Sequence, residues 1–483
     1  MSLLNLLTTL KQYEFGRTLL DFRNYLTADI VTKGLAFISI PVLTRLLSPA
    51  DYGIVSIFLS YVGIFAVLFS LNAHGSVGRY FYEKKADFSE FFGSSISLTI
   101  VCLSLTLSIF LFFADKLSLW LGLPQILLYL LFPGVLYGII HSFFRNIYIH
   151  SRESKKVATV KITYAYLYFA LSVVIILLLD DDLYLGPILA SVLTSVGLSI
   201  WLAIFLKPYF KPAFKKQHVL YILSYSVPQI PYILSSIILA QFDRLMINSY
   251  IGNTEAGLYS FAYNIGMLTH MVSESLFQAW MPDWFKYMDQ ENYVKRDKDI
   301  KKIIRIILLV SMFLMVFGEN VAKFLADKSF LASTNLIPLI IIGHVFLMIF
   351  RVYGDYPQYV KKTYWLVVMF FASAGLNIIL NAIFIPRYGY VAGAYTTVIS
   401  YFLLAILGFS VAKYILKIFV TPLHLLGKPL AIFFLFAILL YGLFGLNLSI
   451  FWELSVKSIF IVIFVTALFV DYIGEIKLFS NRL

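Results

Sequence analysis

The chain has 483 residues, of which 60% are hydrophobic and only 13% charged, and its formal net charge is +12. So few polar side chains cannot cover the surface of a soluble globule, whereas lipid can cover an apolar surface. The composition therefore excludes a soluble globular protein and indicates one embedded in a membrane. Nothing in the chain resembles a nucleic-acid-binding module, and we expect no nucleic-acid partner.

Residues 1–25 differ from the apolar stretches that follow. Charged side chains alternate with leucines there, instead of forming a basic start followed by an apolar block as in a cleavable signal peptide. We therefore predict an amphipathic cytoplasmic segment that lies along the membrane interface.

Apolar stretches of about 20 residues recur between Leu26 and Tyr472. At about 1.5 Å of helical rise per residue, each is long enough to cross a hydrocarbon core of about 30 Å. We predict an all-α polytopic membrane protein with fourteen transmembrane helices. The expected spans are 26–47, 52–73, 91–113, 122–149, 157–179, 184–206, 221–246, 256–281, 303–323, 334–354, 364–385, 389–412, 423–445 and 451–471.

The basic residues orient this topology. If the N-terminus is cytoplasmic, Lys and Arg concentrate on the inner connections, where they face anionic lipid. The exceptions on outer connections are Arg45, Lys116, Arg244, Lys323, Lys328, Arg387 and Lys457. Cytoplasmic loops show this bias, so we expect a multi-pass plasma-membrane protein with both termini in the cytoplasm.

The chain carries a weak internal repeat. Short matches recur in order at offsets of 204 to 207 residues. The matched pairs are Asp51-Tyr52-Gly53 with Glu255-Ala256-Gly257, Phe144-Arg145 with Phe350-Arg351, Lys155-Lys156 with Lys361-Lys362, and Gly186 with Gly393. We predict two parallel, pseudo-symmetric six-helix lobes, residues 26–210 and 211–417, followed by two extra helices and a cytoplasmic C-terminus in residues 418–483.

The single cysteine, Cys102, lies in an apolar span. Neither a disulfide framework nor a thiolate metal site is therefore available, and we expect no cofactor. The connections between spans are short, which leaves no room for a soluble domain.

Three sequence runs carry a resemblance to a known family. They are T-R-L-L-S-P-A-D-Y-G from Thr44 to Gly53, F-D-R-L-M-I-N from Phe242 to Asn248 followed by G-L-Y-S from Gly257, and N-A-I-F-I-P-R-Y-G-Y-V-A-G-A from Asn381 to Ala394. The chain resembles the polysaccharide-lipid flippases of O-antigen and capsule repeat units. These belong to the multidrug, oligosaccharidyl-lipid and polysaccharide exporter superfamily.

This resemblance implies a two-lobed core in a bacterial inner membrane, with a central cavity lined by spans 1, 2, 7 and 8. It also implies transport by alternating access of an undecaprenyl-diphosphate-linked oligosaccharide from the cytoplasmic to the outer leaflet. The expected partners are the lipid-linked oligosaccharide, membrane lipids and the polysaccharide polymerase machinery. The candidate driving forces are protons, sodium and the membrane potential, and the sequence does not decide among them.

Lys33 lies inside the first span, about 10 Å from its cytoplasmic edge at helical rise. An ammonium group there is suited to bind the phosphates of the substrate. Alternatively, Lys33 snorkels toward the interface or pairs with Asp29 one turn earlier.

The eighth span carries the most polar stripe of the chain. Its members recur at steps of three or four residues and so share one helical face. They are Tyr263, Met267, His270, Glu274 and Gln278. A His and a Glu one turn apart inside a membrane are typical of a proton or cation relay, and we predict that Glu274 couples transport to an ion. The alternative is a structural ion pair, with Lys33 as a candidate partner.

Arg145 and Arg351 occupy equivalent places in the two repeats, near the inner mouth. Because the guanidinium fork matches phosphate oxygens, the two side chains are candidates to receive a diphosphate from the cytoplasm. Ordinary anchoring by positive charges on the cytoplasmic side is the competing interpretation.

Asp243 and Arg244 lie near the outer end of the seventh span. They form either a gate or a local structural pair. Earlier in that span, Pro228 and Pro231 remove backbone donors, so we expect the helix to bend there and to be a moving element.

Two other functions remain as alternatives. An ion-coupled multidrug or small-molecule exporter of the same superfamily is expected to have 12 helices and central carboxylates, whereas this chain has Lys33 and two further spans. A membrane glycan polymerase or ligase usually needs a large outer loop for its catalytic groups, and the outer loops here are short. The prediction is therefore a transporter and not an enzyme.

Overall fold

The computed structural model describes residues 27, 31–32, 34–35, 38–83, 87–151, 153–443 and 450–480. Over these residues the secondary structure is helical, without a strand, and 11 helices are long and apolar enough to cross a membrane. The prediction of an all-α polytopic membrane protein is confirmed.

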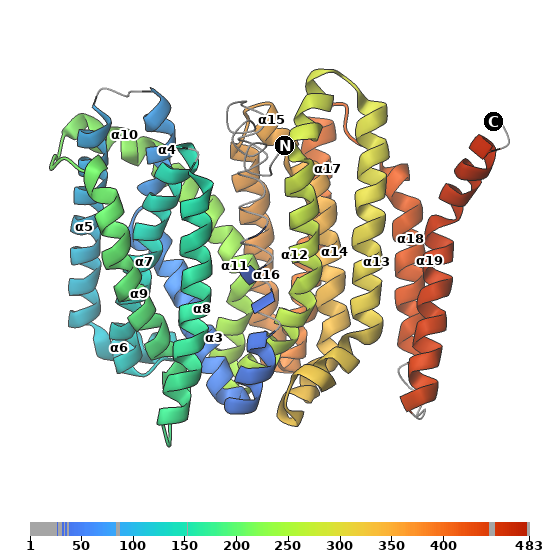
Figure 1. The fold of residues 1–483 in the computed structure, drawn as a ribbon, viewed down its shortest axis with the longest axis horizontal. Coiled ribbons are helices and arrows are strands. Elements are labelled where there is room, and N and C mark those ends of the chain that lie inside the picture. The colour runs from blue at the N-terminus through green and yellow to red at the C-terminus, as the bar shows by residue number, and fades with distance from the viewer. Residues whose placement is uncertain are drawn as a thin grey trace, which may run out of the picture. The chain divides into compact units, whose positions relative to one another are not determined.

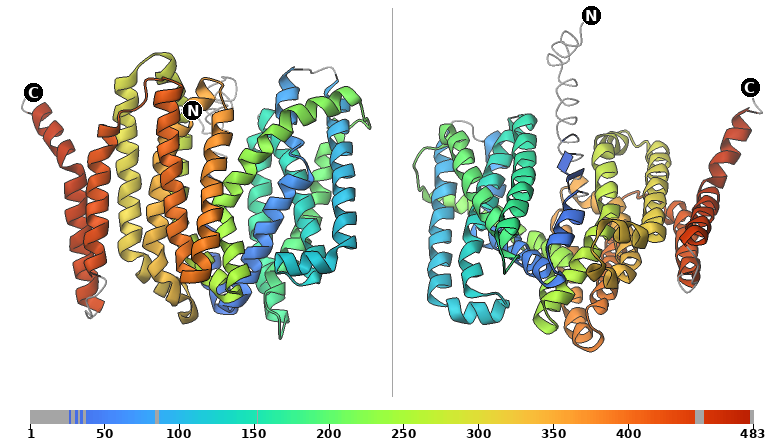
Figure 2. Two further views of the ribbon diagram at one scale, coloured as in Figure 1. Left: turned by 180° about the vertical axis from the view of Figure 1, so that it is seen from behind. Right: turned by 60° about the horizontal axis from the view of Figure 1, so that its bottom comes forward.

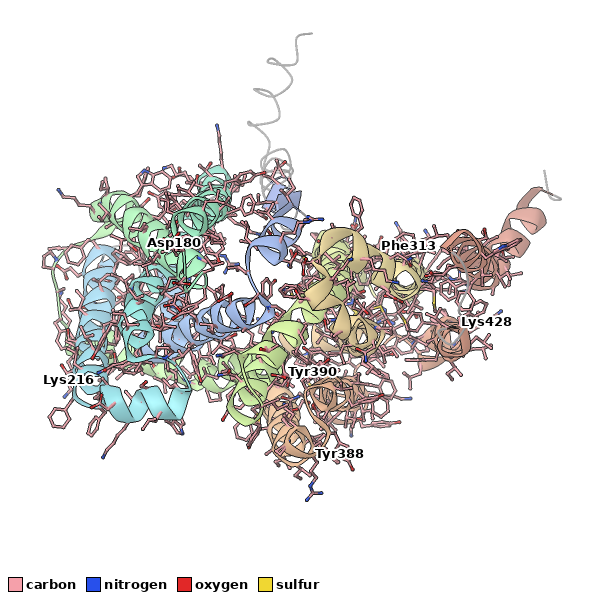
Figure 3. All side chains as sticks on the ribbon, turned by 90° about the horizontal axis from the view of Figure 1, so that it is seen from below. Asp180, Lys216, Phe313, Tyr388, Tyr390 and Lys428 are labelled. Atoms are coloured by element: carbon pink, nitrogen blue, oxygen red, sulfur yellow. The ribbon has the colours of Figure 1, made fainter. Side chains whose placement is uncertain are left out.

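The chain divides into two compact units, residues 1–257 and 258–483. Figure 1 shows α4 and α10 at one end of unit 1 and α6 at the other. The helices of unit 1 are α3 (Pro49–Phe69), α4 (His74–Glu83), α5 (Phe88–Phe112), α6 (Ala114–Leu121), α7 (Gln125–His150), α8 (Ser154–Leu178), α9 (Leu185–Leu206), η1 (Lys207–Tyr209), α10 (Lys216–Ser226), η2 (Val227–Gln229), α11 (Ile230–Tyr250) and the start of α12 (Asn253–Asp289). Asp180 marks the turn between α8 and α9 (Figure 3).

Unit 2 contains the rest of α12. Its other helices are α13 (Tyr293–Leu325), η3 (Lys328–Leu336), α14 (Ile337–Gly354), α15 (Tyr356–Tyr359), α16 (Tyr364–Tyr388), α17 (Val391–Ser410), the π-helical η4 (Val411–Ile415), α18 (Leu423–Leu443) and α19 (Ile450–Ser480). In its core α17 packs between α14 and α16, and α13 packs against α18. The last two helices, α18 and α19, lie side by side (Figure 2).

Most predicted spans coincide with a helix. The predicted spans 256–281 and 303–323 fall within α12 and α13, which are not among the 11 apolar helices, and the first predicted span is only partly described. The count of fourteen therefore stays a prediction. The predicted lobe boundary at residue 210 likewise stays a prediction, although α10 and α11 beyond it pack against α3, α4 and α5 of unit 1.

The predicted second span, 52–73, is wrong at its C-terminal end. The helix α3 ends at Phe69, and the chain then passes through left-handed backbone at Leu71 and Asn72 before α4 begins. The side-chain amide of Asn72 donates a hydrogen bond to the carbonyl oxygen of Ser226, at 3.5 Å. The run that precedes the break is apolar, whereas Ser70, Asn72 and His74 at the break are polar.

That hydrogen bond reaches a second break. A bend was expected at Pro228 and Pro231, and the 3₁₀ turn η2 separates α10 from α11 at this point. That this segment moves stays a prediction. The α3–α4 and α10–α11 breaks of unit 1 therefore adjoin each other through Asn72 and Ser226.

The start of α3 has a strong sequence signal. Ser48 is the N-cap, Pro49 occupies the first turn, and Asp51 completes a capping box with Ser48. The amide of Asp51 donates to the Ser48 hydroxyl at 3.2 Å, and the Ser48 amide donates back to the Asp51 carboxylate at 3.1 Å. The S-P-A-D run therefore fixes where this helix begins.

Two glycines of the internal repeat meet at this same point. A Cβ atom on Gly53 would lie 2.0 Å from the carbonyl oxygen of Asn253, and one on Gly257 would lie 1.8 Å from that of Pro49. The first turns of α3 and α12 therefore cross with their backbones in direct contact, which only glycine permits. The matched D-Y-G and E-A-G sequences are thus the two sides of one helix crossing.

A buried polar network joins α16 to α17. Asn381 donates to the side-chain oxygen of Asn377 at 3.1 Å and accepts a hydrogen bond from Thr396. All three side chains are buried. Tyr388 and Tyr390 mark the turn that joins the two helices (Figure 3). The N-A-I-F-I-P-R-Y-G-Y-V-A-G-A run is thus explained by packing of this hairpin.

Candidate functional site

A column of polar side chains runs through unit 2, between α12, α14 and α17. At one end, the hydroxyls of Tyr263 on α12 and Tyr401 on α17 lie 3.3 Å apart. The Tyr263 ring meets the edge of His344 on α14, with centroids 5.4 Å apart. His344 in turn stacks on His270 of α12, with centroids 5.6 Å apart and planes inclined by 17°.

The other end of the column is charged. Nε of Arg351 on α14 lies 3.5 Å from Oε2 of Glu274 on α12, and the same guanidinium donates through Nη1 to the carboxylate of Asp355. The amide of Gln278 donates to Oε1 of Glu274 at 3.0 Å. The ring of Phe277 lies 5.9 Å from the guanidinium carbon of Arg351.

These charged side chains are largely withdrawn from solvent. The exposed fractions are 34% for Glu274, 20% for Arg351 and 10% for Asp355. Two carboxylates and one guanidinium leave one negative charge when all three are ionised. Binding of a single positive charge would make such a cluster neutral. The arrangement is therefore chemically suited to bind and release a single positive charge.

The structure brings together most of the predicted stripe of α12. Tyr263, His270, Glu274 and Gln278 all contact partners of the polar column, as expected for one helical face. The partner of Glu274 is Arg351, whereas the ion pair that we considered from sequence was with Lys33. Lys33 lies outside the described residues. The coupling role of Glu274 stays a prediction.

Sequence reasoning missed two members of the column, Asp355 and Tyr401. The i,i+4 spacing of Arg351 and Asp355 on a helical face was a usable signal for the first, because oppositely charged residues at this spacing are neighbours. Tyr401 had no comparable signal, since its role depends on how α17 packs against α14.

Arg145 has different surroundings from its repeat counterpart Arg351. It is exposed on α7 of unit 1, and no acidic side chain pairs with it among the residues that the structure describes. Its positive charge acts on His74 of α4 and, together with that of Lys161 on α8, on His141. The two repeat-related arginines are thus electrostatically unlike: Arg145 belongs to a basic cluster, and Arg351 is neutralised by carboxylates.

Asp243 and Arg244 lie inside α11, about two turns before its end at Tyr250. Asp243 is buried and Arg244 is half-buried. Their assignment as a gate stays a prediction.

A Ser–His–Asp arrangement at the start of α5 has the residue types of a catalytic triad. Ser94 Oγ lies 3.2 Å from Nδ1 of His218, and Nε2 of His218 lies 3.2 Å from Asp87. Ser94, however, donates its hydrogen to the carbonyl oxygen of Glu90, and both Ser94 and His218 are buried. Partial desolvation alone would raise the pKa of Asp87, but hydrogen bonds from Tyr80 and His218 hold it below its usual range. The group therefore attaches α10 to α5 and is not an activated nucleophile.

The fold and these clusters define a multi-pass helical membrane protein with charged groups set within its transmembrane helices. The chain belongs to the polysaccharide biosynthesis protein family, whose sequence model matches residues 22–288. The chain is 22% identical over 353 residues to "Lsg locus putative protein 1" of Haemophilus influenzae, a match that covers 70% of this chain and 84% of that protein.

Solved structures show the same fold. A structure described as lipid II flippase MurJ in an inward closed conformation matches with a TM-score of 0.68 and 16% identity, over 94% of this chain and all of that one. An inward-facing multidrug resistance MATE transporter of the MOP superfamily matches with a TM-score of 0.63 and 16% identity, over 80% of this chain and 98% of that one. The chain therefore shares its fold with these two membrane proteins.

Proposed function

We propose that the protein flips undecaprenyl-diphosphate-linked oligosaccharide repeat units from the cytoplasmic to the outer leaflet of the bacterial inner membrane. Two findings support this function: membership of a polysaccharide biosynthesis family, and a fold that covers the whole of a lipid flippase. The repeat units would then pass to polymerase machinery on the outer side. In this proposal both termini are cytoplasmic. The transport cycle alternates access to the substrate between the two sides of the membrane.

The observation that carries this proposal is the basic cluster around Arg145. Arg145 is exposed on α7, and no carboxylate pairs with it among the residues that the structure describes, so its guanidinium can receive an anion. A diphosphate offers two groups that accept bidentate hydrogen bonds from a guanidinium. Arg145 is therefore the proposed diphosphate contact, with Lys33 as a second cation. Arg351 is less suited to that role, because Glu274 and Asp355 already neutralise it.

The charged end of the polar column is the proposed coupling site. Taking up one proton or sodium ion would neutralise the cluster, and release of that ion would restore its single negative charge. Glu274 is the proposed exchanging carboxylate, because it is the more exposed of the two and can leave Arg351 paired with Asp355. The stacked histidines His270 and His344 would tune or relay the charge.

The function is tested by complementation in a strain that lacks this protein. Arg145→Ala should reduce surface glycan about tenfold or more, because a hydrogen bond to a charged group is worth about 1.5–3 kcal/mol. Arg145→Lys should retain part of the activity, since the charge persists without the planar fork. Arg387→Ala, which removes an exposed arginine from the end of α16, is the matched control. Normal glycan with Arg145→Ala at equal protein level would refute the proposed contact.

The coupling proposal is tested separately with purified protein in vesicles. Glu274→Gln keeps the shape of the side chain, and its remaining carbonyl oxygen can still accept the hydrogen bond from Gln278. The variant should still flip substrate, but its rate should no longer respond to an imposed proton or sodium gradient. If the gradient changed the rate of Glu274→Gln as much as that of the wild type, the Glu274–Arg351 pair would have only a structural role.

A further inference from the structure

A separate apolar cavity lies in unit 1, between α5 on one side and α7 and α9 on the other. Its volume is about 640 Å³. That volume lies within the range of about 300–1,000 Å³ that is typical of ligand sites. Its walls include Phe92, Ile100, Leu136, Phe143, Ile200 and Ala203. Near one end, α5 packs against α4 and α10, and near its other end it packs against α6. The cavity separates the middle of α5 from α7 and α9.

Water is a poor occupant of this cavity. Among the described residues that line it, only Thr99 and Lys207 have polar side chains. The hydroxyl of Thr99 is already used, because it donates to the carbonyl oxygen of Ser95 at 2.9 Å. A water molecule needs about two to four polar partners, and these walls do not provide them. A cavity of this size left empty would forfeit the dispersion contacts of every side chain around it. Hydrocarbon is therefore the fitting occupant.

The cavity is also open to the hydrocarbon of the bilayer. Ile100 on α5 and Ile200 and Ile204 on α9 line it and are exposed at the surface of these membrane-spanning helices. An alkyl chain can therefore enter sideways from the lipid without crossing a polar layer.

One end of the cavity is basic. Lys207 lines it where α9 passes into η1, in a connection that the sequence predicts to be cytoplasmic. Neighbouring Lys211 and Lys215 both pair with Glu90, whereas Lys207 is exposed and has no acidic partner among the residues that the structure describes. An ammonium at the mouth of an apolar cavity, at headgroup level, complements a phosphate joined to an alkyl chain.

We propose that this cavity is a binding site for an anionic phospholipid of the cytoplasmic leaflet. One acyl chain fills the space between α5, α7 and α9, and the headgroup phosphate contacts Lys207. The bound lipid completes the packing of unit 1. The site is distinct from the basic cluster of Arg145 and from the polar column of unit 2, so it does not depend on the proposed transport function.

Two variants test the site by removing different parts of it. Ala203→Trp places a large side chain in the cavity, and its control is Val196→Trp, on the exposed face of the same helix outside the lining. Lys207→Glu reverses the charge at the mouth, and its control is Lys298→Glu, at an exposed lysine of α13 in unit 2.

The measurement is native mass spectrometry of full-length protein from nanodiscs of phosphatidylglycerol and phosphatidylethanolamine, spiked with undecaprenyl phosphate. We expect wild type and both controls to retain phosphatidylglycerol, and Ala203→Trp to lose it. In Lys207→Glu, the ratio of bound phosphatidylglycerol to bound phosphatidylethanolamine should fall by about tenfold or more. Equal retention by Ala203→Trp, an unchanged preference in Lys207→Glu, or retention of undecaprenyl phosphate in place of phospholipid would each overturn the proposal. Lys207→Glu keeps the test valid if Ala203→Trp fails to fold.

Discussion

The crossing of α3 and α12 at Gly53 gives a sharp test of the structure. In Gly53→Ala the new Cβ would lie 2.0 Å from the backbone oxygen of Asn253 and 2.9 Å from the amide nitrogen of Gly257. Neither atom belongs to a flexible side chain, so the two helices must move apart. Overpacking of this kind costs about 1–3 kcal/mol and sometimes more.

The same substitution at a different glycine of α3 provides the control. Gly63 is also helical, but no atom of the residues that the structure describes lies within 4 Å of the position that its Cβ would take. An alanine in a helix is favoured over glycine by roughly 0.5–1 kcal/mol, and that gain applies to both variants. The two free energies of unfolding should therefore differ by about 1–3 kcal/mol, with Gly53→Ala the less stable protein.

Thermal unfolding of the purified variants in one detergent measures this difference. We expect the midpoint for Gly53→Ala to fall below that of the wild type, and that for Gly63→Ala to equal or exceed it. Gly257→Ala should resemble Gly53→Ala, because its Cβ would lie 1.8 Å from the carbonyl oxygen of Pro49. If Gly53→Ala were as stable as Gly63→Ala, the close crossing of the two helices would be wrong.

Three further predictions concern the polar groups. Thr396→Val should lower the free energy of unfolding by about 1–3 kcal/mol, because it removes the hydroxyl that donates to the buried oxygen of Asn381. Chemical denaturation measures this change, and an unchanged stability would contradict the network. Arg351→Ala should destabilise the protein more than the double variant Arg351→Ala with Glu274→Gln, because the single variant removes the guanidinium and keeps both carboxylates. Equal stabilities of the two variants would show that Arg351 and Glu274 are not coupled. Lys33→Ala should abolish glycan export while Lys33→Arg retains part of it, and near-normal export by the alanine variant would favour snorkelling instead.

Much of the fold could be predicted because the bilayer restricts which backbone structures can cross it. Backbone groups in hydrocarbon must be satisfied within each segment, so a long apolar run becomes a helix whatever its neighbours are. The start of α3 could also be predicted from the sequence, because the capping box of Ser48 and Asp51 is formed by residues close together in the chain. The break after Phe69 was not predicted, and the tertiary contact of Asn72 with Ser226 at this break cannot be read from the local sequence.

The candidate site was predictable in part for the same reason. Helical periodicity places His270, Glu274 and Gln278 on one face, but it does not identify what faces them. The pairing of Arg351 with Glu274 depends on how α14 packs in unit 2. The repeat suggested that Arg145 and Arg351 are equivalent, yet repeat symmetry fixes only backbone position and not the charges nearby, which differ between the two units.

The central claim is tested most directly by transport in vesicles that contain only this protein. The measurement is the fraction of undecaprenyl-diphosphate-linked oligosaccharide that becomes accessible to an enzyme on the opposite side of the vesicle membrane. We predict rapid transfer by the wild type, transfer slowed about tenfold or more by Arg145→Ala, and transfer near the wild-type rate by Arg387→Ala. Wild-type vesicles that transfer the lipid-linked oligosaccharide no faster than protein-free vesicles would contradict the account.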